Sequence, residues 1–509
     1  MRTRTQLGIL LCALLFLFSS CEKAMQESAA ANPDQVFVAL TKDLVLQTYN
    51  ANDLSKPQKS VQVTGLESAE TILGIDYRPA NGLLYALGNT SRIYIINQMT
   101  GVATALGSKP FIPALSGIIA GFDFSPREDL IRIVTTTGQN LRVHPETGVV
   151  QNVDNNINGA AGVQISGSAY TEPTRLPSFT PELYAIDVVA KKLYKQSPLA
   201  GTLTEQGSLT IPNSSGETGF DISYTGIALA AITSGNSSGL YQINLSNGAT
   251  TALGTFPDKI IGLAMQAEPV AYVIGFRDTT YTAYQITALT PERPSPGGSL
   301  SNLPPGETIV AIDFRPSTGQ LYGLGRTSRL YTIDLTTLAV KQVGNTQFSP
   351  LLSGTNFGFD FNPAADRIRV VSNTGQNLRL DPNTGLVAAV DANLNPGSPS
   401  VSAAAYTNNF SGASSTTLYT IDHVTDCLYR QDPPNNGVLT LVGPLGVDIL
   451  ADNGFDITGT TGTAYAFLTT TGVFSDLYSI NLSTGKATYI LTRATAFGIC
   501  KGLAIGTGF

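Results

Sequence analysis

Six aspartates recur at one position of a repeated strand motif, and they are the residues in this 509-residue chain best suited to chemistry. Side chains alternate along a strand, so in G-F-D-F the Asp and the Gly share one face and the aromatic residues take the other. Three carboxylates around one channel could bind Ca²⁺. With Glu70 or Glu307 they could instead act as acid, base and nucleophile on a glycosidic bond. The candidate channel carboxylates are Asp76, Asp123, Asp221, Asp313, Asp360 and Asp456.

The regular repetition of these aspartates favours a structural role over a catalytic one. A catalytic set needs unlike residues in unlike environments, whereas these occupy the same position each time. Each Asp could accept hydrogen bonds from backbone N–H groups or from a hydroxyl of the neighbouring sheet. We therefore predict no catalytic residue and no required cofactor, with Ca²⁺ in the channel as the open alternative.

A second candidate site lies in the segments TTTGQNLR (135–142) and SNTGQNLR (372–379). An Arg–Asp pair beside an amide-rich loop could hold a carboxylate or a sugar. The preceding strands and turns supply such pairs, Arg132 with Asp129 and Arg369 with Asp366. The same groups could equally form ion pairs between sheets and complete a tight hairpin turn, so both interpretations stay open. The candidate ligand-binding residues are Asn140, Arg142, Asn377 and Arg379.

Other chemistries find little support in the composition. The chain has two histidines, His144 and His423, which fall at unlike positions of the repeat, and it contains no HExxH, CxxC, GxSxG or phosphate-loop motif. This argues against histidine-based catalysis and zinc sites. The formal net charge is −7 with no basic cluster, so nucleic acid is not an expected partner.

The sequence segments that position these residues occur twice in the chain. Over 29 positions, residues 120–148 and 357–385 share 18 identical residues. The correspondence continues at a nearly constant offset, which indicates a tandem duplication covering about 35–268 and 269–509. Inside each half, units of roughly 45 residues carry four short strand-like runs separated by turns, which is the pattern of β-propeller blades.

The ends of each half predict how its ring closes. Residues 36–50 supply strands of a blade that lacks its first strand, and residues 260–265 supply a first strand without a blade. The second half repeats this arrangement. We therefore predict an all-β protein of two tandem five-bladed propellers. Only four residues, QAEP, separate the last strand-like run of the first half from the first run of the second half, so one ten-bladed ring is the alternative.

The N-terminus has the pattern of a bacterial export signal. Two arginines precede an apolar run that is too short to cross a membrane, and the small residues Ser19 and Ser20 precede Cys21. This segment resembles a lipobox. We predict a signal peptide over 1–20, lipidation of Cys21 and a polar tether over 21–34. The lipid anchor would be the only membrane link, placing the protein in the bacterial cell envelope, in the periplasm or on the surface of the outer membrane.

The duplicated phrase GFDFNPAADRIRVVSNTGQNLRLDPNTG (358–385) and its first copy resemble the bacterial domain-of-unknown-function family 4394, and the resemblance covers nearly all of the mature chain in two copies. It implies a propeller-like extracytoplasmic domain and brings no reaction or ligand. The sequence thus predicts a non-enzymatic binding or scaffold module, with a polysaccharide or an envelope protein as partner. The alternative is a glycan-directed hydrolase or lyase that uses the channel carboxylates.

Overall fold

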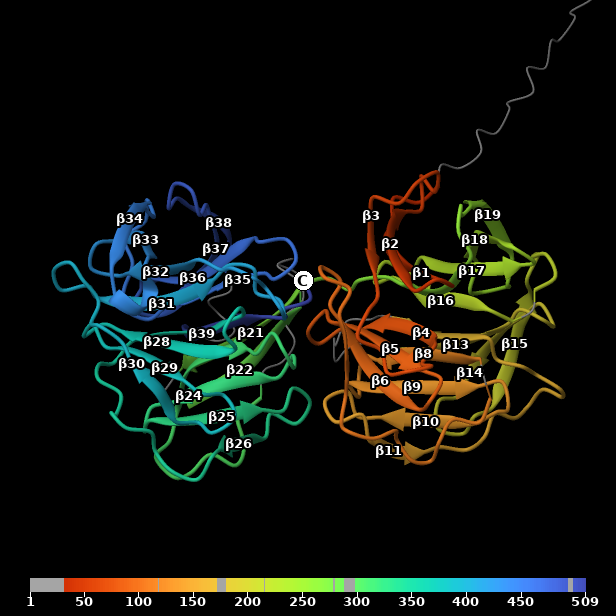
Figure 1. The fold of residues 1–509 in the computed structure, drawn as a ribbon, viewed down its shortest axis with the longest axis horizontal. Coiled ribbons are helices and arrows are strands. Elements are labelled where there is room, and N and C mark those ends of the chain that lie inside the picture. The colour runs from red at the N-terminus through yellow and green to blue at the C-terminus, as the bar shows by residue number, and fades with distance from the viewer. Residues whose placement is uncertain are drawn as a thin grey trace, which may run out of the picture.

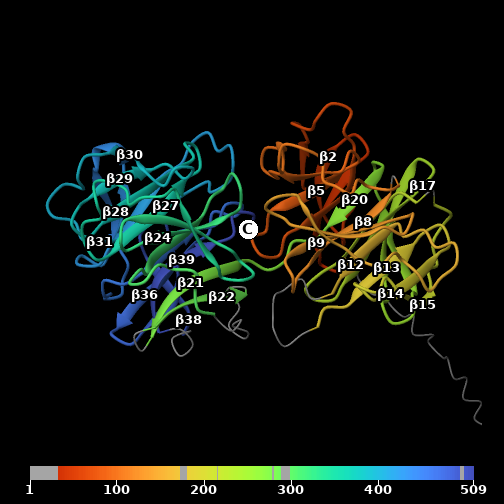
Figure 2. The same cartoon turned by 90° about the horizontal axis from the view of Figure 1, so that it is seen from below.

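The structure consists of short antiparallel strands gathered into two lobes that lie side by side (Figures 1 and 2). The computed structural model describes residues 32–117, 119–171, 180–214, 216–277, 280–287, 298–492 and 498–509. Within these residues the regular structure is β, apart from a 3₁₀ turn at Pro434–Asn436. The predicted signal peptide, Cys21 and most of the tether lie outside the described residues. Among the described residues no helix is long and apolar enough to cross a bilayer.

The first lobe contains five four-stranded sheets, with orders β20-β1-β2-β3, β4-β5-β6-β7, β11-β10-β9-β8, β12-β13-β14-β15 and β16-β17-β18-β19. The strands are β1 (Val36–Thr41), β2 (Val45–Asn50), β3 (Lys59–Gln62), β4 (Ile72–Tyr77), β5 (Leu84–Gly88), β6 (Arg92–Ile96), β7 (Ala103–Ala105), β8 (Ala120–Ser125), β9 (Leu130–Thr135), β10 (Asn140–Val143), β11 (Val150–Val153), β12 (Gly167–Tyr170), β13 (Leu183–Asp187), β14 (Lys192–Gln196), β15 (Leu203–Ser208), β16 (Thr218–Ile222), β17 (Ala228–Ser234), β18 (Ser237–Ile243), β19 (Thr250–Thr255) and β20 (Ile260–Ala264).

The second lobe repeats this plan with orders β22-β21-β39, β23-β24-β25-β26, β27-β28-β29-β30, β31-β32-β33-β34 and β35-β36-β37-β38. The strands are β21 (Val270–Arg277), β22 (Thr280–Thr287), β23 (Ile309–Phe314), β24 (Leu321–Gly325), β25 (Arg329–Ile333), β26 (Val340–Val343), β27 (Phe357–Asn362), β28 (Arg367–Ser372), β29 (Asn377–Leu380), β30 (Val387–Val390), β31 (Val401–Tyr406), β32 (Leu418–Asp422), β33 (Cys427–Gln431), β34 (Leu439–Pro444), β35 (Gly454–Ile457), β36 (Ala464–Thr471), β37 (Phe474–Ile480), β38 (Ala487–Thr492) and β39 (Ile499–Ile505).

The last strand of each lobe pairs with the first strand of the same lobe. Strand β20 pairs antiparallel with β1, and Ala39 lies opposite Leu263. Strand β39 pairs antiparallel with β21, and Val273 lies opposite Leu503. These are the pairings that the strand-like ends of each half predict.

The innermost strands of each lobe follow one another in a circuit. In the first lobe β4 contacts β8, β8 contacts β12, β12 contacts β16, β16 contacts β20, and β20 contacts β4. The second lobe has the same circuit through β23, β27, β31, β35 and β39. We call these ten elements the inner strands. The architecture is therefore propeller-like, with the sheets of each lobe gathered around common inner strands.

Glycines let the inner strands approach one another. A Cβ atom on Gly121 would lie 2.3 Å from the Ser168 hydroxyl, and one on Gly219 would lie 2.2 Å from the backbone nitrogen of Leu263. Both glycines lie two residues before an inner-strand aspartate, on the face turned toward the next inner strand. The apolar side chains beside them then pack between neighbouring sheets, as Phe122 and Phe124 do against Tyr85.

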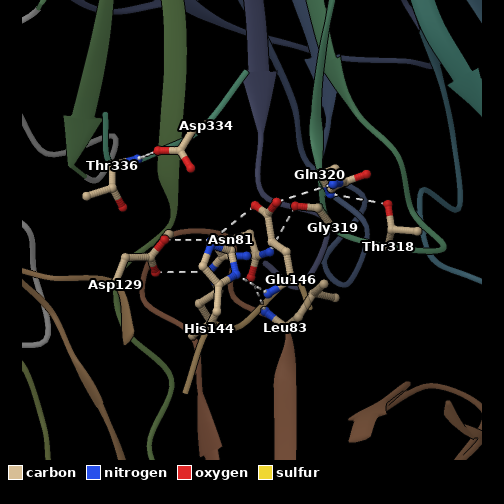
Figure 3. Close-up of polar contacts among 12 residues, drawn as sticks. Asn81, Leu83, Asp129, His144, Glu146, Thr318, Gly319, Gln320, Asp334 and Thr336 are labelled. Atoms are coloured by element: carbon tan, nitrogen blue, oxygen red, sulfur yellow. Dashed lines mark hydrogen bonds and ion pairs between the residues drawn. The ribbon is translucent and has the colours of Figure 1, made fainter. Parts of the chain in front are cut away.

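The two lobes meet through a buried C-terminus and a set of polar contacts. The Tyr272 hydroxyl donates a hydrogen bond to the Ala80 carbonyl at 3.1 Å, and Phe509 is buried in the same apolar cluster as Ala80. Gln320 donates to Glu146 at 3.2 Å from the second lobe to the first (Figure 3). The lobes are thus packed against each other.

The close approach of the inner strands gives a first prediction. Gly219→Ala should destabilise the protein by about 1–3 kcal/mol, because the added methyl group meets backbone atoms that cannot rotate away. Gly472→Ala is the control, since a Cβ there meets nothing within 4 Å. Chemical denaturation of both variants measures the difference. Equal stabilities would contradict the tight circuit.

Candidate functional site

The six aspartates form two buried clusters, one in each lobe. Asp76 on β4, Asp123 on β8 and Asp221 on β16 bring carboxylate oxygens within 4.8 Å of one another, and Asp313, Asp360 and Asp456 do the same in the second lobe. We call these clusters the first and second aspartate triads. Each member is at most 6% exposed. The three aspartates of each lobe are therefore gathered at one buried place among the inner strands.

Each aspartate accepts a hydrogen bond from the backbone of the next inner strand. The Phe124 N–H donates to Asp76 at 2.8 Å, and the Tyr170 N–H donates to Asp123 at 3.2 Å. In the same way Asp221 accepts from the N–H of Met265, just after β20. The second triad has the same pattern, with donors Phe361, Tyr406 and Ile505. The triads therefore link successive inner strands, as the structural interpretation of the aspartates requires.

Burial and mutual repulsion make these carboxyl groups hard to ionise. Desolvation is the main cause and raises the pKa of Asp221 to about 7. It raises the pKa values of Asp76 and Asp123 well above the ordinary range, and the negative charge of neighbouring triad members raises them further. The backbone N–H donors act in the opposite direction but do not cancel the shift. The triad therefore retains protons at a pH where exposed aspartates have lost them.

These raised pKa values give a prediction for pH dependence. A native state that holds more protons than the unfolded chain loses stability as the pH rises. The contribution is complete below the ordinary Asp value of 3.8 and is lost as the pH rises through about 7, where Asp221 titrates, and through the raised pKa values of Asp76 and Asp123. We expect a slope of up to about 1.4 kcal/mol per pH unit for each retained proton.

The Asp123→Asn variant tests this by removing one of the three charges while keeping an oxygen that can accept from Tyr170. Denaturation curves between acid and mildly alkaline pH should show a shallower loss of stability in this variant than in the parent protein. Asp123→Ala should cost about 1–3 kcal/mol at acid pH, where the parent triad holds its protons, because a buried N–H loses its acceptor. A parent protein that grows more stable over the same range would contradict the raised pKa values.

The triads also have the composition of a hard-cation site. Ca²⁺ takes six to eight oxygen ligands, and each triad member can offer one carboxylate oxygen. Further ligands would have to come from water or from a bound molecule. The carboxylate oxygens, however, already accept backbone hydrogen bonds. Asp76 accepts two such bonds, and Asp221 accepts two.

We therefore expect protons rather than a cation to neutralise the triads. Thermal melting with and without a calcium chelator measures this, and the midpoint should stay unchanged. A midpoint that falls with chelator and recovers when Ca²⁺ is added would assign the triads to a structural cation.

Glu70 and Glu307 occupy a different place from the triads. The Tyr94 hydroxyl donates to the Glu70 carboxylate at 2.9 Å, and the Thr90 N–H donates to it at 2.8 Å. Glu307 is held in the same way by Tyr331 and Thr327. Neither glutamate belongs to a group of three or more carboxylates within 4.8 Å among the described residues. Both glutamates are thus held by side chains and backbone of their own sheet, and catalysis with the triads stays an untested alternative.

The GQNLR segments form a network that joins neighbouring sheets. Arg142 makes two hydrogen bonds to Asp154, at 2.8 and 2.9 Å. Asn140 accepts from the buried Arg132 at 2.8 Å and donates to the Pro198 carbonyl of the adjacent sheet at 2.9 Å. In the second lobe Arg379 pairs with Asp391, and Asn377 binds Arg369 and the Pro434 carbonyl.

The partners within this network differ from the pairs that chain proximity suggests. Arg132 pairs with Asp154 rather than with Asp129, and Asp129 pairs instead with Arg78 at 2.6 Å. Arg369 likewise pairs with Asp391, while Asp366 pairs with Arg315. Most donors of these side chains are thus used inside the protein. Ligand binding by Asn140, Arg142, Asn377 and Arg379 stays a prediction.

One feature that the sequence reasoning missed is a pocket between the lobes, which we call the seam pocket. It has a volume of about 660 Å³ and is lined by Gln35, Tyr77, Gln98, Tyr224 and Gln266 of the first lobe and by Thr460 and Tyr465 of the second, among others. The sequence predictions rest on residues that both halves share, whereas Tyr77, Gln98, Tyr224 and Gln266 have other residues at the matching positions of the second half. That difference is a signal that the sequence did contain.

The fold and the triads together define a tandem-repeat, all-β protein with propeller-like lobes. The model of the domain of unknown function DUF4394 matches residues 45–264 and 283–499. The chain belongs to this family and carries two copies of its domain. No protein with a curated function matches the chain.

Among solved structures, the chain is similar to the extracellular domain of a protein described as a hybrid two-component system from B. thetaiotaomicron. The two share 10% sequence identity, the match covers 92% of this chain and 73% of that one, and the TM-score is 0.27. A similarity this weak carries no argument about function.

Proposed function

We propose that the protein is a lipid-anchored module of the bacterial cell envelope that binds or scaffolds a partner and does not catalyse a reaction. In this proposal each lobe is a closed five-bladed propeller, and Cys21 carries the lipid. The pairings of β1 with β20 and of β21 with β39 support two separate rings. A single ten-bladed ring would require the last strand of the chain to pair with the first.

The observation that carries the proposal is that the carboxylates and arginines best suited to chemistry are already bonded to other groups of the protein. All six triad carboxylates accept backbone hydrogen bonds from the next inner strand, and Arg142 and Arg379 are each paired with an aspartate. Groups occupied in this way are poorly placed to attack or protonate a substrate. The same arrangement occurs in both lobes, as expected for groups that serve the fold.

A binding role fits the remaining features of the molecule. Rigid sheets that position variable connections provide binding surfaces, and the seam pocket lies where two such lobes meet. We propose a polysaccharide or an envelope protein as the partner. The hydrolase or lyase alternative draws on the raised pKa of Asp221, about 7, which suits a proton donor near neutral pH. Asp221 is only 6% exposed, however, so a substrate has little access to it.

The Asp123→Asn and Asp360→Asn double variant separates the two functions. We expect the purified full chain, in detergent, to turn over no polysaccharide, and the double variant to keep the binding of the parent chain in a panel of envelope polysaccharides and proteins. Turnover by the parent that disappears in a stably folded double variant would overturn the proposal in favour of catalysis.

A further inference from the structure

We propose that the seam pocket binds a neutral oligosaccharide. This inference rests on the proposed binding function and adds the place and the class of ligand. The volume of about 660 Å³ lies within the range of small-molecule sites, roughly 300–1,000 Å³. A ligand of two or three sugar units would therefore contact both lobes at once.

The pocket lies at one mouth of the first lobe. Tyr77 ends the inner strand β4, Tyr224 lies in the turn after β16, and Gln266 lies just beyond β20. The second lobe adds Thr460, from the turn after β35, and Tyr465, from β36. Residues far apart in sequence thus line the same pocket, because the inner strands β4, β16 and β20 end beside it.

The lining offers the groups that recognise sugars. An amide side chain both donates and accepts hydrogen bonds, as a sugar hydroxyl does, and Gln35, Gln98 and Gln266 are half-buried along the wall. Tyr224 is 41% exposed, so part of its ring is accessible. The face of an aromatic ring carries partial negative charge and attracts the C–H groups of a sugar.

The charge of the lining points to an uncharged ligand. Lys59 and Glu268, which have opposite signs, are the charged side chains among the described lining residues. An acidic polysaccharide would call for a cluster of Arg or Lys, because paired cationic donors recognise carboxylates and sulfates. The pocket therefore favours neutral sugars over acidic ones.

The second lobe shows that the fold does not need these polar residues. The triads fix the correspondence, because Asp76 matches Asp313 and Asp221 matches Asp456. At the positions of Tyr77, Gln98, Tyr224 and Gln266 the second lobe has Phe314, Leu335, Gly459 and Gly506. Phe314 and Leu335 are buried in the apolar cluster that includes the C-terminal Phe509. The polar set is thus particular to the first lobe.

Part of this polar set also builds the wall of the pocket. Gln98 and Gln266 both donate to the Gly508 carbonyl, at 3.0 and 2.6 Å, and the Tyr77 hydroxyl donates to Gln98 at 2.8 Å. These bonds fix the C-terminal segment against the first lobe. Tyr224 has no such bond among the described contacts, so its exposed ring is the group left for a ligand and the best single residue to test.

A peptide is the less suitable occupant. An extended peptide often binds by adding a strand to a free sheet edge. Strand β1 lines the pocket and already pairs on both sides, with β2 and with β20, and the edge strand β3 contributes only its first residue, Lys59, to the lining. Main-chain recognition along β1 is therefore blocked, whereas side-chain recognition of a sugar is not.

The test uses the labelled full chain, in detergent, on an array of neutral, uronate-containing and sulfated oligosaccharides, with a peptide panel beside it. We expect binding to neutral oligosaccharides that weakens about ten-fold or more in Tyr224→Ala, a loss of one good contact. Tyr489→Ala is the matched control, because this tyrosine is 53% exposed on β38 of the other lobe, and it should bind like the parent. Thermal melting checks that the variants fold, and Gln35→Ala serves as a second variant of the wall.

Three other results would contradict the site, the class of ligand, or the binding function itself. Neutral-sugar binding that is unchanged in both Tyr224→Ala and Gln35→Ala would overturn the site. Binding of acidic sugars or of peptides alone would overturn the class of ligand but leave the proposed binding function standing. Absence of binding to every sugar, peptide and envelope protein tested would overturn both.

Discussion

The structure depends on the contact between consecutive inner strands. At each such contact in the first lobe that carries an aspartate, the carboxylate accepts the backbone N–H of the next strand, and a glycine two residues earlier allows the backbones to approach. A buried N–H without an acceptor is costly, so the carboxylate satisfies a donor that the close approach hides from water. The G-F-D-F motif thus provides space and hydrogen bonding in one short stretch.

This arrangement has an electrostatic consequence. Three inner strands with aspartates bring three carboxyl groups to one buried space, where desolvation and repulsion raise their pKa values. The remaining inner strands of the first lobe, β12 and β20, have Ala169 and Ala264 at the same position, which keeps the number of charges at three. Raised pKa values are common at catalytic sites. In these lobes the fold itself gives a sufficient cause for the raised values.

Much of the fold was predictable from the sequence because it is repeated. The 45-residue period, the turn residues and the incomplete units at the ends of each half indicated the strands and the pairing of β1 with β20. The shared face of the aspartates followed from strand alternation. The ion-pair partners did not follow, because Arg78 reaches Asp129 of the neighbouring sheet and Arg132 reaches Asp154 at the far side of its own sheet, and neither contact is indicated by spacing in the sequence. The seam pocket exists only once the two lobes are docked, so the sequence could indicate its unusual residues, which differ between the halves, but not their convergence.

The central claim is that the aspartates link the inner strands and retain protons there. The most direct measurement is a carboxyl-carbon NMR titration of the protein labelled at aspartate, with the triad signals assigned by Asp→Asn variants. Our account predicts that Asp221 titrates near pH 7 and that Asp76 and Asp123 titrate well above the ordinary range. Triad signals that all titrate near the usual value of about 3.9 would contradict it.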